Sequence, residues 1–214
     1  MRARWIVSTL CVALLVAVGG LIAAEAEVTA KVEKKEFKAT CPVSGQPAIE
    51  DSVLDLKKLK AGDGKVYFCC KNCPKAFEKD PAKFALKTAR QLAETGQVVQ
   101  VACPVSGHDF DEEVTVETGN TKVAFCCENC QKKYNEADED GKLKVVFADL
   151  EKGFTRQTMC PVSGKPINPK ASVEHEGKKV YFCCPGCPAA FEADPKKFME
   201  KLPQFAKADD AEKK

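Results

Sequence analysis

Short runs of apolar and aromatic residues, broken by turn residues, predict small β-hairpins along this chain. In the clearest case, residues 171–176 and 178–182 flank Gly177, and both runs have the length and composition of strands. Asp63-Gly64 and Gly119-Asn120 mark the corresponding turn at two earlier positions. Helix-forming composition follows each hairpin, at residues 74–79, 131–137 and 188–193. The pattern therefore predicts a small α+β unit that occurs three times.

A repeated cysteine pattern accompanies these units and accounts for twelve of the thirteen cysteines. Each copy reads Cys-Pro-Val-Ser-Gly and, further on, Phe-Cys-Cys-x-x-Cys. The first cysteine and the Cys-Cys pair are separated by 22 residues in the second and third copies and by 27 in the first, which carries an insertion around residues 54–61. A fixed repeat indicates one structural unit used three times, so each copy is expected to do the same chemistry. The cysteines are Cys41, Cys69, Cys70 and Cys73, then Cys103, Cys126, Cys127 and Cys130, then Cys160, Cys183, Cys184 and Cys187.

Domain boundaries follow from this repeat. We predict modules at residues 37–90, 99–150 and 156–203, the second being degenerate after its cysteine pair. Residues 87–100 and 147–157 are expected to connect them, the first with a helix from Lys87 to Thr95. A charged tail is placed at 204–214, and fraying is expected from Ala206 to Lys214. Modules of this size bury too little apolar surface to fold alone, so they need a metal ion or disulfides.

The N-terminus predicts a cleavable signal peptide over residues 1–26. Arg2 and Arg4 precede an apolar run over residues 5–24, and Ala24-Glu25-Ala26 forms a small-residue cleavage site. The chain is therefore expected to be secreted or periplasmic. The alternative is an uncleaved membrane anchor, because the run approaches the length of a spanning helix.

The cysteines could form disulfides or bind metal. Export to an oxidising compartment favours disulfides, whereas this spacing in a cytosolic protein favours metal binding. Local sequence favours metal. A Cys-x-x-Cys at a helix start, with a third cysteine one hairpin upstream, directs thiolates toward one tetrahedral ion. Backbone N–H groups in the first helical turn are expected to stabilise the thiolates of Cys73, Cys130 and Cys187.

Aromatic residues are expected to cover the cysteines. Phe77, Tyr134 and Phe191 each lie four residues after the last cysteine, and therefore on the same helix face. Together with Phe68, Phe125 and Phe182 they predict a small core beside each site. Asp80-Pro81 and Asp194-Pro195 predict a new helix after the first one, with Asp as N-cap.

Other functions are disfavoured by composition. The net charge is only +2 with both signs interspersed, which does not suggest a nucleic-acid partner. No histidine base, carboxylate pair or phosphate-binding glycine loop recurs with the cysteines, so an enzyme is not expected. His108 and His175 do not repeat, and both are predicted to be surface residues.

At the level of motifs, the chain resembles the YHS and TRASH family of small treble-clef-like metal-binding domains. Cys-Pro-Val-Ser-Gly, a Gly-containing hairpin, Val-Tyr-Phe-Cys-Cys and Phe-Glu-x-Asp-Pro-x-x-Phe carry the resemblance. It implies three modules, each built from a knuckle, a β-hairpin and short helices, and a role in heavy-metal sensing, trafficking or resistance, particularly for copper. The ligands it implies are Cys41, Cys69 and Cys73, with Cys103, Cys126 and Cys130, and Cys160, Cys183 and Cys187.

The fourth ligand stays open. Where many relatives have a second upstream cysteine, this chain has Ser44, Ser106 and Ser163, whose neutral hydroxyls are poor ligands for soft metals. The extra cysteines, Cys70, Cys127 and Cys184, either complete a closed zinc site or leave an open three-thiolate site that suits exchange of Cu(I). We expect them to contribute, because an unused thiol is a liability in an oxidising compartment.

The sequence thus predicts an exported metal-binding protein that holds about one zinc, copper or other thiophilic ion per repeat. A metal transporter or another extracytoplasmic protein is the expected partner, and a membrane only if the signal segment is uncleaved. The alternatives are an interaction scaffold with structural zinc, disulfides or an iron–sulfur centre at the cysteines, and thiol-disulfide exchange at Cys70 and Cys73.

Overall fold

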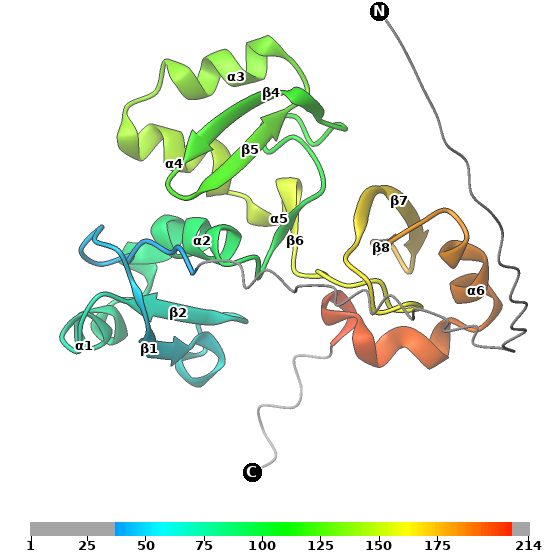
Figure 1. The fold of residues 1–214 in the computed structure, drawn as a ribbon, viewed down its shortest axis with the longest axis horizontal. Helices are drawn as coiled ribbons and strands as arrows, with labels where there is room; N and C mark the ends of the chain where they lie inside the picture. Colours follow the sequence, from blue (N-terminus) through cyan, green and yellow to red (C-terminus); the bar gives the residue numbers. More distant parts are fainter. Residues whose placement is uncertain (1–36, 207–214) are drawn as a thin grey trace, which may run out of the picture. The chain divides into compact units, whose positions relative to one another are not determined.

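The computed structural model describes residues 37–206 and shows a mixed α+β architecture (Figure 1). Within that range the strands form four two-stranded antiparallel sheets. Three of these sheets are hairpins, as predicted, and the fourth pairs β3 (Val99–Gln100) with β6 (Phe154–Thr155). The predicted signal peptide with Cys11, and the tail from residue 207 onward, lie outside the described residues. The α+β class is confirmed.

The three hairpins share one irregular register. In each, the residue just before the Cys-Cys pair faces the start of the first strand, and the pairing then shifts before it resumes near the turn. At such an irregularity the extra residues of one strand are left unpaired, and the strand bends there. The hairpins are β1 (Ile49–Asp55) with β2 (Lys65–Phe68), β4 (Asp111–Thr118) with β5 (Thr121–Phe125), and β7 (Asn168–His175) with β8 (Lys178–Phe182).

The turns of the hairpins differ. Gly119-Asn120 connects β4 to β5 directly, as predicted, with Gly119 at φ +63°. Glu176 and Gly177 both have positive φ, 48° and 74°, which matches the right-handed twist of the flanking strands. Asp63-Gly64 lies in the connection between β1 and β2, as predicted, but that connection is a longer loop rather than a tight turn, because β1 already ends at Asp55. The insertion fills the intervening loop with the 3-10 helix η1 (Leu56–Leu59), whose Leu56 is buried.

A short helix follows each Cys-Cys pair and carries the last cysteine in its first turn, as predicted. Cys73 and Cys187 open their helices with Pro74 and Pro188 behind them, where proline's missing N–H costs no helical hydrogen bond. Cys130 is the third residue of its helix. The helices are α1 (Cys73–Lys79), α3 (Glu128–Asn135) and α6 (Cys187–Ala193).

The segments after these helices are where the repeats diverge. Asp80 accepts a hydrogen bond from the Lys83 backbone N–H at 3.2 Å, and Asp194 occupies the N-cap position of η3 without a side-chain cap. In the second repeat Asp138 caps α4 by accepting from the Gly141 N–H at 2.8 Å. The elements are η2 (Ala82–Phe84) and α2 (Ala85–Glu94), then α4 (Glu139–Phe147) and α5 (Leu150–Gly153), and finally η3 (Pro195–Lys201) and η4 (Pro203–Phe205).

The repeats do not have one core each. Buried residues of the first and second repeats form a single cluster, whereas the third repeat has its own. Helix α2 fills the first predicted connector, and its Ala89, Gln91 and Leu92 are buried rather than solvated. It packs against α4. None of the helices between residues 37 and 206 is long and apolar enough to cross a membrane.

Candidate metal centres

Each repeat brings three cysteine sulfurs together. The sets are those implied by the resemblance, and within each set the Sγ atoms all lie within 4.8 Å of one another. In every set the first and last cysteines are buried and the middle one is half-buried. The triads are Cys41, Cys69 and Cys73; Cys103, Cys126 and Cys130; and Cys160, Cys183 and Cys187.

The sulfur separations fit a bound thiophilic ion. The Sγ atoms of Cys69 and Cys73 are 3.6 Å apart, those of Cys126 and Cys130 are 3.6 Å apart, and those of Cys183 and Cys187 are 3.7 Å apart. Two thiolates that bind one zinc tetrahedrally at about 2.3 Å are about 3.8 Å apart. A disulfide requires about 2.05 Å, and all twelve cysteines of the described residues are free thiols. The donor set therefore suits zinc or copper.

The Cys-Pro-Val-Ser-Gly segment forms a tight turn around the first sulfur of each triad. In the first repeat the Gly45 N–H donates to the Cys41 carbonyl at 2.9 Å, and the Cys41 N–H donates to Gln46 at 2.8 Å. Gly45 has φ +76°, which glycine adopts readily and other residues rarely do. Gly107 and Gly164 repeat this geometry in the other two copies.

The serine hydroxyl of this turn lies within hydrogen-bond distance of a triad sulfur. Ser44 Oγ accepts from the Gln46 N–H at 3.2 Å and lies 3.1 Å from Cys69 Sγ. When that sulfur is a thiolate it carries no proton, so the serine hydroxyl is then the donor. Ser106 and Ser163 make the same contacts with Cys126 and Cys183, at 3.2 and 3.1 Å. The sequence identified these serines as poor ligands and missed this role.

The first cysteine of each triad is biased toward the thiolate. Burial has the largest influence on the Cys41 thiol and raises its pKa, but hydrogen bonds from the Ser44 hydroxyl and from nearby backbone N–H groups together outweigh burial. They lower the pKa of Cys41 to about 7. The same balance lowers the pKa of Cys103 to about 7 and that of Cys160 to about 6.

The last cysteine behaves in the opposite way, which corrects the expectation of a thiolate in the first helical turn. Burial, reinforced by hydrogen bonds with the other sulfurs, raises the pKa of Cys73 and brings that of Cys130 to about 12. The pKa of Cys187 also rises to about 12, mainly through its hydrogen bond with Cys184. A cation that binds the triad must therefore displace protons from the last cysteine.

The extra cysteine of each repeat lies outside the triad, exposed to solvent. Cys70 Sγ is 3.5 Å from Cys73 Sγ and Cys184 Sγ is 3.6 Å from Cys187 Sγ, whereas Cys127 Sγ is 3.7 Å from Cys126 Sγ. These thiols, rather than the last cysteines, accept hydrogen bonds from the backbone N–H groups at the start of the following helix. Backbone N–H groups lower the pKa of all three, with the largest contribution from Asn72 for Cys70.

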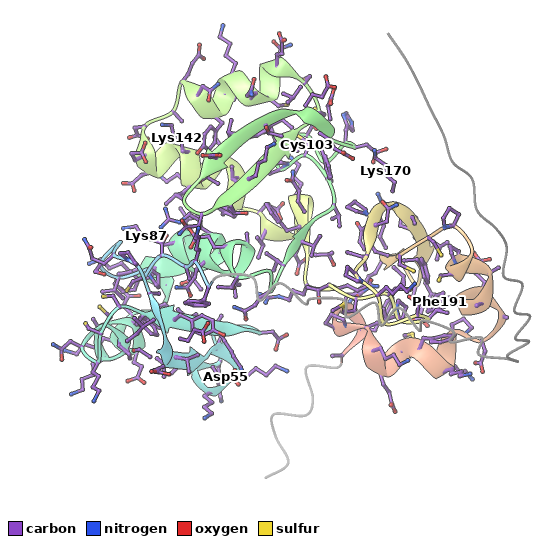
Figure 2. The ribbon with its side chains drawn as sticks, in the orientation of Figure 1. Asp55, Lys87, Cys103, Lys142, Lys170 and Phe191 are labelled. Atoms are coloured by element: carbon purple, nitrogen blue, oxygen red, sulfur yellow. The ribbon has the colours of Figure 1, made fainter. Side chains whose placement is uncertain are left out.

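The aromatic residues occupy the predicted positions. Phe77 packs edge-on against Phe68 at a centroid distance of 5.5 Å, and Phe191 packs edge-on against Phe182 at 5.6 Å. The second repeat has Tyr134 against Phe125 at 6.0 Å. Phe191 is labelled in Figure 2, as is Cys103 of the second triad. The rings belong to the same buried clusters as the triads.

The histidine prediction is half right. His108 is exposed, as expected. His175 is half-buried and packs edge-on against Phe191 and Phe205, at centroid distances of 5.2 and 5.8 Å. The imidazole lies at the end of β7 and packs against aromatic rings at the edge of the third repeat's core.

Comparisons with protein families, with characterised proteins and with solved structures found no match to this chain. The class of site therefore rests on the geometry: three repeated cysteine triads that could each hold a metal ion.

Proposed function

We propose that this chain is an exported metal-handling protein in which each repeat holds one thiophilic ion. The observation that supports it is the threefold recurrence of a cysteine triad whose sulfurs lie within 4.8 Å of one another. Export rests on the signal predicted from residues 1–26, and the role in heavy-metal handling agrees with the YHS and TRASH resemblance.

Exchangeable binding of a soft ion such as Cu(I) is favoured by the composition of the site. Three cysteines converge, and the next nearest polar side chain is a serine hydroxyl that bonds to sulfur rather than supplying an anionic ligand. Three soft thiolates with an open position suit a Cu(I) ion that is received and passed on. The half-buried middle cysteine and the exposed extra thiol provide a path to solvent.

A scaffold with structural zinc is the second candidate, and one observation favours it. Cys70 Sγ lies 3.5 Å from Cys73 Sγ, a distance that two ligands of one tetrahedral ion can have. In that case the metal stabilises the fold, and the function lies on the outer surfaces of the modules.

Native mass spectrometry of the chain purified under reducing conditions tests metal binding. We expect three ions per chain. Chelator competition then separates the candidates, because a carrier releases its ions with its fold intact while a structural zinc domain unfolds. A chain that binds no ion near neutral pH, with its cysteines reduced, would refute the proposal.

A further inference from the structure

A glutamine side chain bridges the same two segments in every repeat. In the first repeat Gln91 Nε2 donates to the carbonyls of Thr40 and Tyr67 at 2.9 and 2.7 Å, and its Oε1 accepts from the Tyr67 N–H at 2.8 Å. Thr40 immediately precedes Cys41, and Tyr67 lies two residues before Cys69. One amide therefore links the segment that carries the first sulfur to the strand that carries the second.

Gln157 makes the same three bonds in the third repeat. Its Nε2 donates to the Met159 carbonyl at 3.1 Å and to the Tyr181 carbonyl, and its Oε1 accepts from the Tyr181 N–H at 3.0 Å. Met159 immediately precedes Cys160, and Tyr181 lies two residues before Cys183.

Gln100 completes the set in the second repeat. Its Nε2 donates to Ala102 at 3.1 Å and to Ala124 at 2.5 Å, and its Oε1 accepts from the Ala124 N–H at 2.9 Å. Gln91 and Gln157 are fully buried, and Gln100 is half-buried.

The three glutamines do not come from equivalent positions in the sequence. Gln100 and Gln157 each lie three residues before the first cysteine of their repeat. In the first repeat that position is Lys38, and the amide is supplied instead by helix α2, which follows the cysteines. The same hydrogen bonds to the same two segments are thus formed from opposite ends of the module.

From this recurrence we propose that Gln91, Gln100 and Gln157 are positioning residues for the metal centres. The amide fixes the distance between the first and second cysteines of each triad, and it holds the sulfurs in place before an ion arrives. Such partners behind the ligands tune metal affinity even though they do not touch the metal. The inference rests on the proposed function, since it concerns the same three centres.

Cobalt(II) titration of the full chain under reducing conditions tests this inference, because thiolate–cobalt absorption reports the number and geometry of the ligands. Gln91→Met and Gln100→Met keep the side-chain length and remove all three hydrogen bonds. We expect each variant to hold one of its three cobalt ions about 10- to 100-fold more weakly. We also expect an altered absorption spectrum of that site when it is saturated, which a purely structural loss would not produce.

Gln97→Met is the matched control. Gln97 clamps the same strand, accepting from the Lys65 N–H at 2.6 Å and donating to the Lys65 carbonyl at 2.8 Å, but it makes no bond to the segment before Cys41. Its variant should bind cobalt as the wild-type chain does. If Gln91→Met does not fold, Gln100→Met decides, because the half-buried Gln100 is more tolerant of substitution.

Unchanged affinity and spectra in the variants, or an equal loss in Gln97→Met, would overturn the inference while leaving the proposed function in place. A wild-type chain that binds no thiophilic ion, whether cobalt, zinc or Cu(I), would overturn both.

Discussion

The first two repeats and the third complete the same module in different ways. Repeats 1 and 2 share one buried cluster, to which α2 and α4 both contribute. The third repeat closes its own core with η3, where Phe198 is buried, and with Leu202 just after it. The comparison teaches that the triad and hairpin do not form a complete core, and that each module needs an additional apolar cover.

A buried carboxylate marks the contact between the first two repeats. The Glu94 side chain is fully buried and accepts hydrogen bonds from the Thr40 N–H at 2.6 Å, the Thr40 hydroxyl at 3.0 Å and the Asn120 N–H at 3.1 Å. Arg90 lies 3.3 Å away and supplies the compensating charge. The segment before Cys41 is thereby tied to the turn between β4 and β5.

The largest expected effect is a difference between two cysteine variants. Cys187→Ser should remove one ion and destabilise the third repeat alone. Cys73→Ser should remove one ion and also loosen the second repeat, because the two share a core. Native mass and hydrogen exchange resolved by repeat measure both outcomes. Faster exchange in the first repeat of Cys187→Ser would contradict the separation of the cores.

The shared core itself can be broken at Glu94. Glu94→Ala should destabilise repeats 1 and 2 by about 3 kcal/mol, because three partly buried donors and a largely buried guanidinium lose their partner. The third repeat should be unaffected. Denaturant unfolding followed by exchange in each repeat is the measurement. Glu112→Ala is the control: its ion pair with Lys170 is exposed, so a change of under about 1 kcal/mol is expected. Equal effects of the two substitutions would refute the role of Glu94.

Lowering the pH should remove the metal ion from one repeat before another. A thiol whose pKa is lowered keeps its thiolate until the pH falls through that lowered value. The pKa is about 7 for Cys103 and about 6 for Cys160. As the pH falls, protons therefore compete with the metal ion for the Cys103 thiolate before they compete for the Cys160 thiolate. We expect the third repeat to retain its ion to a lower pH than the second. Native mass spectra across the acid range count the ions, and simultaneous loss from all repeats would count against this ordering.

The smallest effect is expected for the exposed thiols. Contrary to the expectation from the sequence, replacing Cys70, Cys127 and Cys184 together with serine should leave three ions bound and change their affinity by less than about tenfold, because the three sulfurs of each triad converge without them. Chelator titration of the variant beside the wild-type chain tests this. A steep loss of affinity would instead assign these cysteines to closed four-thiolate zinc sites.

The sequence was sufficient for the local features. Hairpins, cysteine-bearing helices and aromatic positions depend on residues a few positions apart, and the twelve repeated cysteines located every triad. What it could not reveal are contacts between distant residues. Thr40 meets Glu94 across 54 positions and Asn120 across 80, and no local pattern encodes such a pairing.

Two single residues show the same limit. Gln91 lies on a helix that composition assigned to a connector, and only the tertiary structure brings its amide to Tyr67. His175 does not recur, and the sequence therefore predicts a surface position. In the structure its ring packs against Phe191 and Phe205 of the third repeat, which has a separate core.

The position of Gln91 also imposes an order of events during synthesis. A chain emerges with its N-terminus first, so Cys41 and Cys69 are made before the amide that holds their segments together. The first module cannot be completed until α2 has emerged, and its Glu94 contacts must wait further, for Asn120. The second and third modules carry their glutamine ahead of their cysteines and face no such delay. The thiols of the first module thus wait until α2 arrives, and that interval is when they are most open to wrong disulfides.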